Sequence, residues 1–204
     1  MSVENFLPGG NEKINKLLRF AAETDKMTAI LRRTMLVDGS RRENDAEHSW
    51  HIALMCMLFK DFAPQGTDVS RAVQMCIVHD LIEIYAGDTF AYDISGNQDK
   101  AEREAKAADK LFSQLPENLA KDFRTLWEEF DAMETPDAKY AAAMDRLQPF
   151  LHNTLTEGHT WKEGKPSLDM VEKRVGVAKE IIPEISDWYN KNIERALNEG
   201  WLYN

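Results

Sequence analysis

The sequence predicts one all-α domain, and three observations support that fold class. Apolar residues recur at helical spacing over most of the 204 residues. Helix-capping residues, prolines and glycines divide these segments at intervals, and no segment alternates apolar and polar residues like a half-buried strand. With 43% apolar residues the chain can bury one sizeable core. We expect that core over about 12–157, with C-terminal helices over about 167–199 packed on it.

The first half of the chain predicts four helices, of which the third is central. Asn44 precedes a segment with Glu47 at its third helical position, the pattern of a capping box. The helix that follows is apolar on every side, so we expect it to be buried. Asp68 can cap the next helix, and Gly87 ends it. The four helices are expected over about 11–23, 25–33, 45–61 and 69–86.

The second half predicts two loops and five helices. Pro116 separates two amphipathic helices, Thr135 and Pro136 form a cap with a first-turn proline, and Ser167 can cap a later helix. The elements are expected as a loop over 87–96, helices over about 98–114, 117–133 and 136–157, a loop over 158–166, and helices over about 167–182 and 183–199.

Composition and charge limit the classes of function. The formal net charge of −10 argues against a nucleic-acid surface, which needs clustered Lys and Arg, but it permits a small anionic substrate at a local positive site. The first residues lack a signal-peptide pattern, and no segment approaches the roughly 20 apolar residues of a membrane span. Cys56 and Cys76 lie in apolar runs and are expected to be free of disulfides. We therefore expect a cytoplasmic protein.

The adjacent residues His79 and Asp80 are the most informative feature of the chain. They interrupt an apolar run that predicts a buried helix, and a buried aspartate needs a partner or a metal ion. His48 and Asp145 lie in two other apolar helices and can close a site with two imidazoles and two carboxylates. This donor set suits Mn, Fe, Co, Ni or Zn. A hydrogen-bonded pair without metal is the alternative, and His51 is the rival of His48.

Further polar residues surround these candidate ligands. Glu83 lies one helical turn after His79, where it can serve as a general acid or base or as a plain salt-bridge partner. Asp88 follows a helix end, where a loop can meet substrate. A basic cluster precedes the first ligand, and any of its arginines can hold phosphate or simply face water: Arg32, Arg33, Arg41 and Arg42.

The ordered set of His48, His79-Asp80, Glu83, Gly87-Asp88 and Asp145 resembles the HD-domain metal-dependent phosphohydrolases, and in particular their 5′-deoxynucleotidase branch. The resemblance covers about residues 12–157. It implies a helical fold that binds one divalent metal ion (Mn, Co, Fe, Ni or Zn). It also implies hydrolysis of nucleoside 5′-monophosphates, preferably 2′-deoxynucleotides.

The resemblance also implies roles for single residues. It assigns the metal to His48, His79, Asp80 and Asp145 and the catalytic carboxylate to Glu83. Arg33 falls at the position of a phosphate-orienting arginine, although Arg32 or Arg41 can serve instead, and Asp88 at that of a sugar-contacting aspartate. The bacterial enzymes carry a tryptophan after that arginine, tied to sugar discrimination, where this chain has Thr34.

Two other functions stay open at this stage. The same metal site can serve another phosphate ester, such as a nucleoside triphosphate, a cyclic nucleotide or a non-nucleotide ester. Alternatively, the protein binds a metal ion and a nucleotide without catalysing a reaction, although the presence of Glu83 argues against this function. Family habit and the aromatic residues Trp188, Tyr189 and Trp201 suggest a homodimer, although these aromatics can instead dock the last helix.

Overall fold

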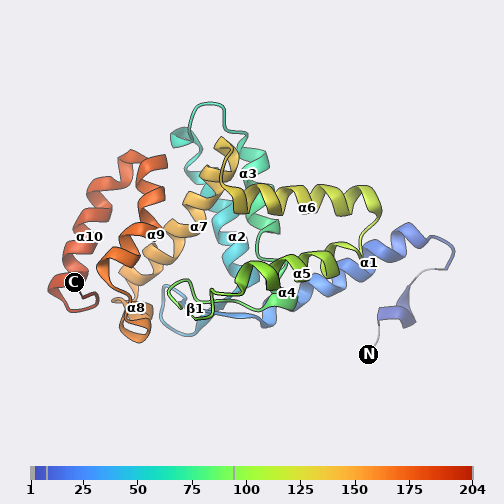
Figure 1. The fold of residues 1–204 in the computed structure, drawn as a ribbon, viewed down its shortest axis with the longest axis horizontal. Coiled ribbons are helices and arrows are strands. Elements are labelled where there is room, and N and C mark those ends of the chain that lie inside the picture. The colour runs from blue at the N-terminus through green and yellow to red at the C-terminus, as the bar shows by residue number, and fades with distance from the viewer. Residues whose placement is uncertain (1–2, 8, 94, 204) are drawn as a thin grey trace.

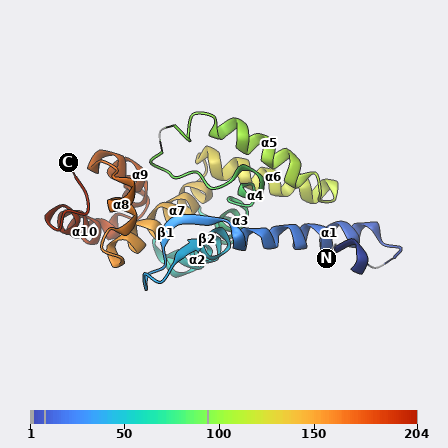
Figure 2. The same ribbon diagram turned by 90° about the horizontal axis from the view of Figure 1, so that it is seen from below.

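The computed structural model describes residues 3–7, 9–93 and 95–203, and it confirms the predicted helical class. Figures 1 and 2 show α2, α3 and α7 in the middle of the molecule, with α1, α5 and α6 extending to one side and α8 to α10 on the other. The helices of the described residues are α1 (Glu12–Thr24), α2 (Asp45–Leu58), α3 (Val69–Val78), α4 (Glu83–Ala86), α5 (Lys100–Phe112), α6 (Glu117–Ala132), α7 (Pro136–Leu155), α8 (His159–Gly164), α9 (Leu168–Ile181) and α10 (Ser186–Asn198).

The central helices begin where the capping residues predict. The Asn44 side chain accepts a hydrogen bond from the Glu47 backbone N–H, and the Glu47 side chain accepts one from the Asn44 backbone N–H, so the capping box is confirmed. The Thr135 hydroxyl caps α7 by accepting a hydrogen bond from the Ala138 backbone N–H. Because α2 packs on both α3 and α7, the start of α2 faces residues of both neighbours.

The prediction of a helix over 25–33 is wrong. A short 3₁₀ turn over Asp25–Ala29 is followed by strand β1 (Leu31–Met35), which pairs antiparallel with β2 (Arg42–Asn44). Arg32 and Thr34 are buried whereas Leu31 and Arg33 are exposed, the two-residue period of a strand. The alternation of hydrophobic and polar residues does not reveal this strand, because its buried residues are polar. An Asp-Gly turn between the strands was the signal available in the sequence.

The helix expected over 69–86 is divided in two. Helix α3 ends at Val78 and α4 begins at Glu83, and backbone bonds from Leu81 N to Val78 O and from Glu83 N to Asp80 O tighten the residues between them. Asp80 and Glu83 therefore do not hold the relative positions of residues on one continuous helix. The loop predicted over 158–166 likewise contains the short helix α8.

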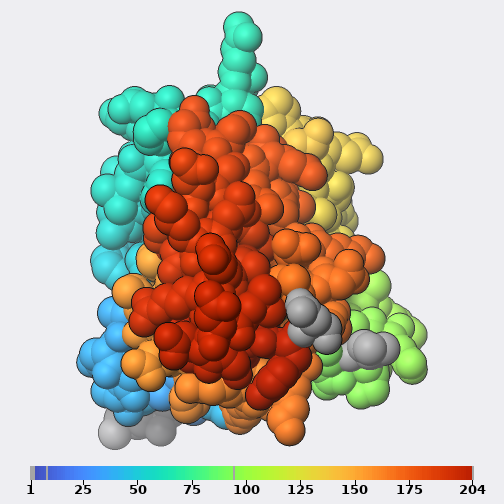
Figure 3. All heavy atoms as spheres, turned by 90° about the vertical axis from the view of Figure 1, so that its left-hand side faces the viewer, coloured from blue at the N-terminus to red at the C-terminus, as the bar shows by residue number. Residues whose placement is uncertain are grey.

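The C-terminal helices close one end of the molecule. Figure 3 shows α9 and α10 covering that end. The Tyr189 ring stacks on Phe150 of α7 with ring centroids 4.6 Å apart, and Trp201 is buried. These two aromatics dock the last helix, so they do not supply a surface for a second copy. Tyr189 and Trp201 belong to one cluster of buried apolar side chains that reaches from Phe20 to Leu202.

Two further expectations concern the cysteines and the membrane. Cys56 and Cys76 are buried free thiols whose sulfur atoms lie 3.4 Å apart across the α2–α3 contact. In the part of the chain that the structure describes, every helix is too short or too polar to cross a membrane.

Candidate metal centre and substrate pockets

Three of the predicted ligands converge from three helices. His48 lies in the first turn of α2, His79 follows the end of α3, and Asp145 lies in the middle of α7. One donor atom from each lies within 4.8 Å of the others. The Nε2 atom of His48 is 3.0 Å from Asp145 Oδ1, and the Nε2 atom of His79 is 3.8 Å from the same oxygen. All three side chains are buried.

Hydrogen bonds orient both imidazoles toward this point. The Nδ1–H of His79 donates to the Cys76 carbonyl at 2.8 Å, because a carbonyl can only accept. The Nδ1–H of His48 donates to Gln148 Oε1 at 3.1 Å. Both Nε2 atoms then present a lone pair to the centre, and His79 Nε2 has no hydrogen-bond partner among the described residues. A buried imidazole nitrogen that has no hydrogen-bond partner and faces a carboxylate and a second imidazole is typical of a metal ligand.

Asp80 lies between this centre and a second group of acids. Its Oδ1 atom is 3.0 Å from His79 Nε2, and its Oδ2 atom is 3.9 Å from His48 Nε2. Oδ2 also accepts a 2.8 Å hydrogen bond from Arg32. Oxygen atoms of Asp80, Asp45 and Glu83 lie within 4.8 Å of one another. The structure thus brings all four predicted ligands together, with Asp80 shared between the metal centre and Arg32.

The protonation of the centre follows from burial and from neighbouring charges. Burial lowers the pKa of His48 to about 4, so this imidazole is neutral at pH 7 and available as a ligand. Burial acts to raise the pKa of Asp145, but its contact with His48 and the charge of Arg174 hold the pKa well below its usual range. Burial and the adjacent charges of Asp80 and Asp45 raise the pKa of Glu83 well above that of an ordinary glutamate.

Glu83 lines the same cavity as three of the candidate ligands. The side chain is 6% exposed at the first residue of α4, and its Oε2 atom lacks a hydrogen-bond partner among the described residues. The cavity at the metal centre, here called the metal-side cavity, is lined by residues that include His79, Asp80, Glu83, Asp145, Arg146 and Arg174. A buried carboxyl group with a raised pKa at this position can hold and transfer a proton.

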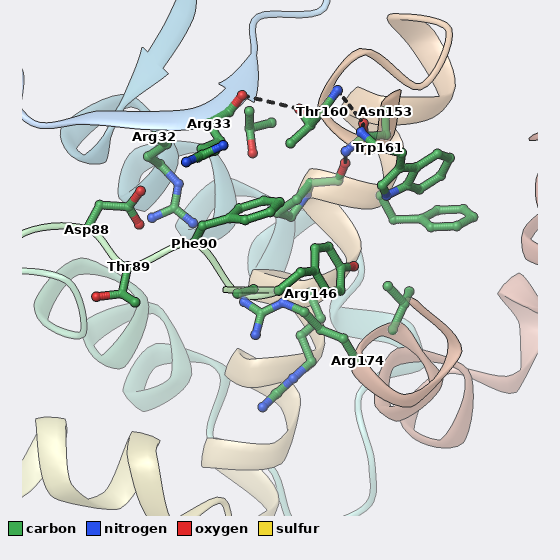
Figure 4. Close-up of a pocket in the computed structure, with 16 residues that line it drawn as sticks. Arg32, Arg33, Asp88, Thr89, Phe90, Arg146, Asn153, Thr160, Trp161 and Arg174 are labelled. Carbon is green, nitrogen blue, oxygen red and sulfur yellow. Dashed lines mark hydrogen bonds between the residues drawn. The ribbon is translucent and has the colours of Figure 1, made fainter. Parts of the chain in front are cut away.

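A second cavity, here called the adjoining pocket, shares a wall with the metal-side cavity. Figure 4 shows this pocket, with the Phe90 ring inside it and Arg33, Asn153 and Trp161 around it. Five residues line both cavities: Arg32, Asp88, Thr89, Arg146 and Arg174. Asp88 therefore lies where the two spaces meet, and Thr34 lines only the adjoining pocket.

The arginines of the predicted basic cluster have different surroundings. Arg32 is buried and pairs with Asp80 at 2.8 Å, Asp45 at 3.4 Å and Glu43 at 3.5 Å. Arg33 is exposed, and its guanidinium lies 4.9 Å from the centre of the Phe90 ring in the adjoining pocket. Arg41 pairs with Glu47 and Arg42 with Glu163, outside both cavities.

Sequence reasoning missed three residues of the site. Gln148 orients His48 from one turn after Asp145, and its position on the ligand face of a predicted helix was the available signal. Arg146 and Arg174 line both cavities. Arg146 follows a predicted ligand directly, whereas Arg174 carries no local signal. His51 and His152 contact one another beside Gln148 and lie outside the group of converging donors.

Comparisons with known proteins show the family to which the chain belongs. The sequence profile of the HD domain matches residues 24–186. The human protein "5′-deoxynucleotidase HDDC2" is 30% identical over 78% of each chain, and the Schizosaccharomyces pombe protein "5′-deoxynucleotidase hdd1" is 26% identical over 78% of this chain and 73% of its own. The chain belongs to the HD domain family, which confirms the resemblance found in its motifs.

Solved structures support the fold. A protein from Magnetospirillum magnetotacticum MS-1, described as a "predicted metal-dependent phosphohydrolase", is 42% identical with a TM-score of 0.90, over 97% of this chain and 99% of its own. The PH0347 protein of Pyrococcus horikoshii OT3, at 23% identity and a TM-score of 0.62 over 88% of this chain and 99% of its own, shares the fold.

Proposed function

We propose that this chain is a metal-dependent phosphohydrolase that removes phosphate from nucleoside 5′-monophosphates, with 2′-deoxynucleotides preferred. One observation carries the proposal: two oriented imidazoles and two buried carboxylates converge beside Glu83, which is buried and whose Oε2 atom has no hydrogen-bond partner among the described residues. The names of the human and yeast relatives support the substrate class.

The proposed metal ligands are His48, His79, Asp80 and Asp145. The donor set of two nitrogens and two carboxylates suits Mn, Co, Fe, Ni or Zn better than Mg or Ca. A bound divalent ion supplies Lewis-acid polarisation of the phosphoryl group and a nucleophilic water at neutral pH. The protein contributes the orientation of both imidazoles through Gln148 and the Cys76 carbonyl.

The proposed role of Glu83 is proton transfer. Water attacks phosphorus, the bond between phosphorus and the 5′-oxygen breaks, and that oxygen needs a proton to leave as a nucleoside hydroxyl. A carboxyl group with a raised pKa holds its proton near neutral pH and can donate it at this step. The attacking water then returns a proton to Glu83, so the residue ends the cycle unchanged.

We propose that Asp88 and Arg33 bind the substrate outside the reacting atoms. Asp88 lies where the two cavities meet, and its carboxylate can accept a hydrogen bond from a sugar hydroxyl. Arg33 and Phe90 form one wall of the adjoining pocket, which places a cation and an aromatic face beside the nucleoside.

The assay for this proposal is phosphate release from a panel of nucleotides with added Mn, Co or Zn. Activity confined to 5′-monophosphates supports it. Release from triphosphates, cyclic nucleotides or other esters instead points to another substrate class. Nucleotide binding without any release points to a protein that does not catalyse hydrolysis.

Glu83→Gln tests the assigned proton transfer. We expect turnover to fall roughly 10²- to 10⁴-fold, the usual share of a general acid or base, while elemental analysis shows unchanged metal content. Glu102→Gln is the matched control, because Glu102 is exposed on α5 and pairs with Lys106. Near-normal turnover of the Glu83 variant removes this residue from the mechanism.

We also propose a homodimer formed through the exposed face of α2. Trp50, Met57 and Leu58 recur at helical spacing, and they are 66%, 58% and 66% exposed. Large apolar side chains on one helix face are suited to an isologous contact with a second copy. Light scattering during size exclusion should give twice the chain mass, and Trp50→Glu should return the protein to a monomer. A monomeric parent protein contradicts the proposal.

A further inference from the structure

We infer that Arg146 and Arg174 together hold the phosphate group of the substrate, a role that motif comparison assigns to Arg33. The inference rests on the proposed phosphohydrolase function and assigns the anion-binding part of that site to helices α7 and α9.

Arg146 and Arg174 lie between the metal centre and the adjoining pocket. Arg146 directly follows the candidate ligand Asp145 on α7, and Arg174 lies on α9, which packs against α7. Both residues line the metal-side cavity and the adjoining pocket. Figure 4 shows the two side chains running from their separate helices into the same space. A phosphate bound at the metal centre with its nucleoside in the adjoining pocket must pass these two guanidinium groups.

The guanidinium groups of Arg146 and Arg174 are only partly compensated by other side chains. Arg146 makes no ion pair among the described residues, and its donors reach only the Ala142 carbonyl at 3.2 Å and the Met133 sulfur at 2.9 Å. Arg146 remains a cation at neutral pH because a guanidinium group does not lose its proton in proteins. Arg174 is 3.6 Å from Asp145 Oδ2, and a third of its side chain is exposed. Both guanidinium groups therefore keep N–H donors for an anion.

The other cations near the metal centre are less suitable for binding phosphate. Arg32 lies among Asp80, Asp45 and Glu43, so its charge is already compensated. Lys100 lies 3.4 Å from Glu104. Arg33 lines the adjoining pocket but not the metal-side cavity, and its guanidinium group lies over the Phe90 ring.

A phosphate group in this cavity needs a pair of positive charges beside it. A phosphate monoester brings up to two negative charges close to the carboxylates of Asp80 and Asp145. Arginine meets phosphate oxygens with two parallel N–H donors, which are among the strongest hydrogen bonds in proteins. Two arginines match a monoester dianion better than a cyclic phosphodiester, which carries one charge. The pair would thus favour nucleoside monophosphates over cyclic nucleotides.

The test compares Arg146→Gln, Arg174→Gln and Arg33→Gln in the full-length, Mn-loaded protein. The readouts are the affinity for inorganic phosphate by calorimetry, the inhibition constant of a deoxynucleoside, and metal content. We expect each of the first two variants to lose roughly 10- to 100-fold in phosphate affinity, with metal content and nucleoside inhibition unchanged. Arg174→Lys should recover part of the loss. Arg19→Gln is the control, because Arg19 pairs with Glu4 and Glu12 on the surface.

Unchanged phosphate affinity in Arg174→Gln overturns the inference, as does a loss confined to Arg33→Gln. If the half-buried Arg146 variant does not fold, the partly exposed Arg174 position still decides the question. Absence of phosphate release from every ester by the parent protein instead refutes the proposed function, and the calorimetric measurement of phosphate affinity still tests the arginine pair.

Discussion

Gln148 connects the candidate metal centre to a buried polar network. Its carbonyl oxygen accepts from His48, and its amide nitrogen donates to Glu43 at 2.7 Å. Burial raises the pKa of Glu43 to about 7. The amide is fully buried, so its two ends are distinguished by their partners. This arrangement holds the proton of His48 on Nδ1 and leaves Nε2 free for the metal.

Gln148→Leu should therefore weaken metal binding. Leucine has a similar volume but cannot accept the His48 proton, so the imidazole loses its fixed orientation. We expect the affinity for Mn or Zn to fall roughly 10- to 100-fold, as for other residues that orient metal ligands. Competition with a chromophoric chelator measures the affinity. Gln98→Leu, in an exposed loop, should change nothing, and an equal fall there would remove the specific role of Gln148.

At this scale the sequence could predict the ligands but not their supports. Histidine and aspartate in apolar helices carry an unsatisfied cost that points to a metal, which is why His48, His79 and Asp145 stand out. Gln148 is marked only by its position on the ligand face of its helix, and Arg174 carries no signal, because an amide or a cation in a helix is ordinary on a surface. Only the packing of α7 against α2 and α9 turns them toward the site.

The conformation of the chain at the end of α4 depends on one glycine. Gly87 ends α4 with φ +76° and ψ 149°, a conformation that is essentially restricted to glycine. No atom lies within 4 Å of the position that a Cβ would take there. The strain of a larger residue would thus come from the backbone alone, and it would act directly on Asp88.

Gly87→Ala should destabilise the protein by about 1–3 kcal/mol because alanine is strained at this φ and ψ. Gly176→Ala is the matched control: it lies inside α9, has open space around the Cβ position and should stabilise the helix by up to about 1 kcal/mol. Urea unfolding curves measure both values. Equal effects at the two positions would show that the Gly87 conformation imposes no cost.

Sequence patterns predicted the long helices better than the short elements. Helices α2, α6 and α7 follow from a cap or a proline and a long apolar pattern. The β1–β2 hairpin was missed because its buried face carries Arg32 and Thr34, whose burial depends on the acids of other elements. The break between α3 and α4 was missed because the apolar run continues through it, so no local signal marks the change in hydrogen bonding.

The contribution of His152 to stability should fall in mild acid. Burial lowers the pKa of His152 to about 4, whereas the unfolded chain takes up that proton near pH 6.5. At this residue the unfolded state therefore binds more protons between these values, and the His152 contribution is lost as the pH falls from about 6.5 toward 4. Burial of His48 acts in the same direction.

His152→Gln isolates this effect, since glutamine can still donate a hydrogen bond and does not titrate. Between pH 7 and pH 5, we expect the metal-free variant to lose about 1–2 kcal/mol less stability than the parent protein. Urea unfolding at the two pH values gives the comparison. Parallel losses in both proteins would mean that His152 is not kept neutral by folding.

The three converging donors also have a consequence for biosynthesis. His48 and Asp145 are 97 residues apart in the chain, so the newly made N-terminal half carries His48, His79 and Asp80 but lacks the Asp145 carboxylate. If these residues hold the proposed metal ion, its full set of ligands forms only after α7 has been synthesised and has docked, and binding of the ion then stabilises fully folded chains over partly folded ones. Each half of a nicked protein would carry only part of the donor set, and reassociation of the halves would restore it.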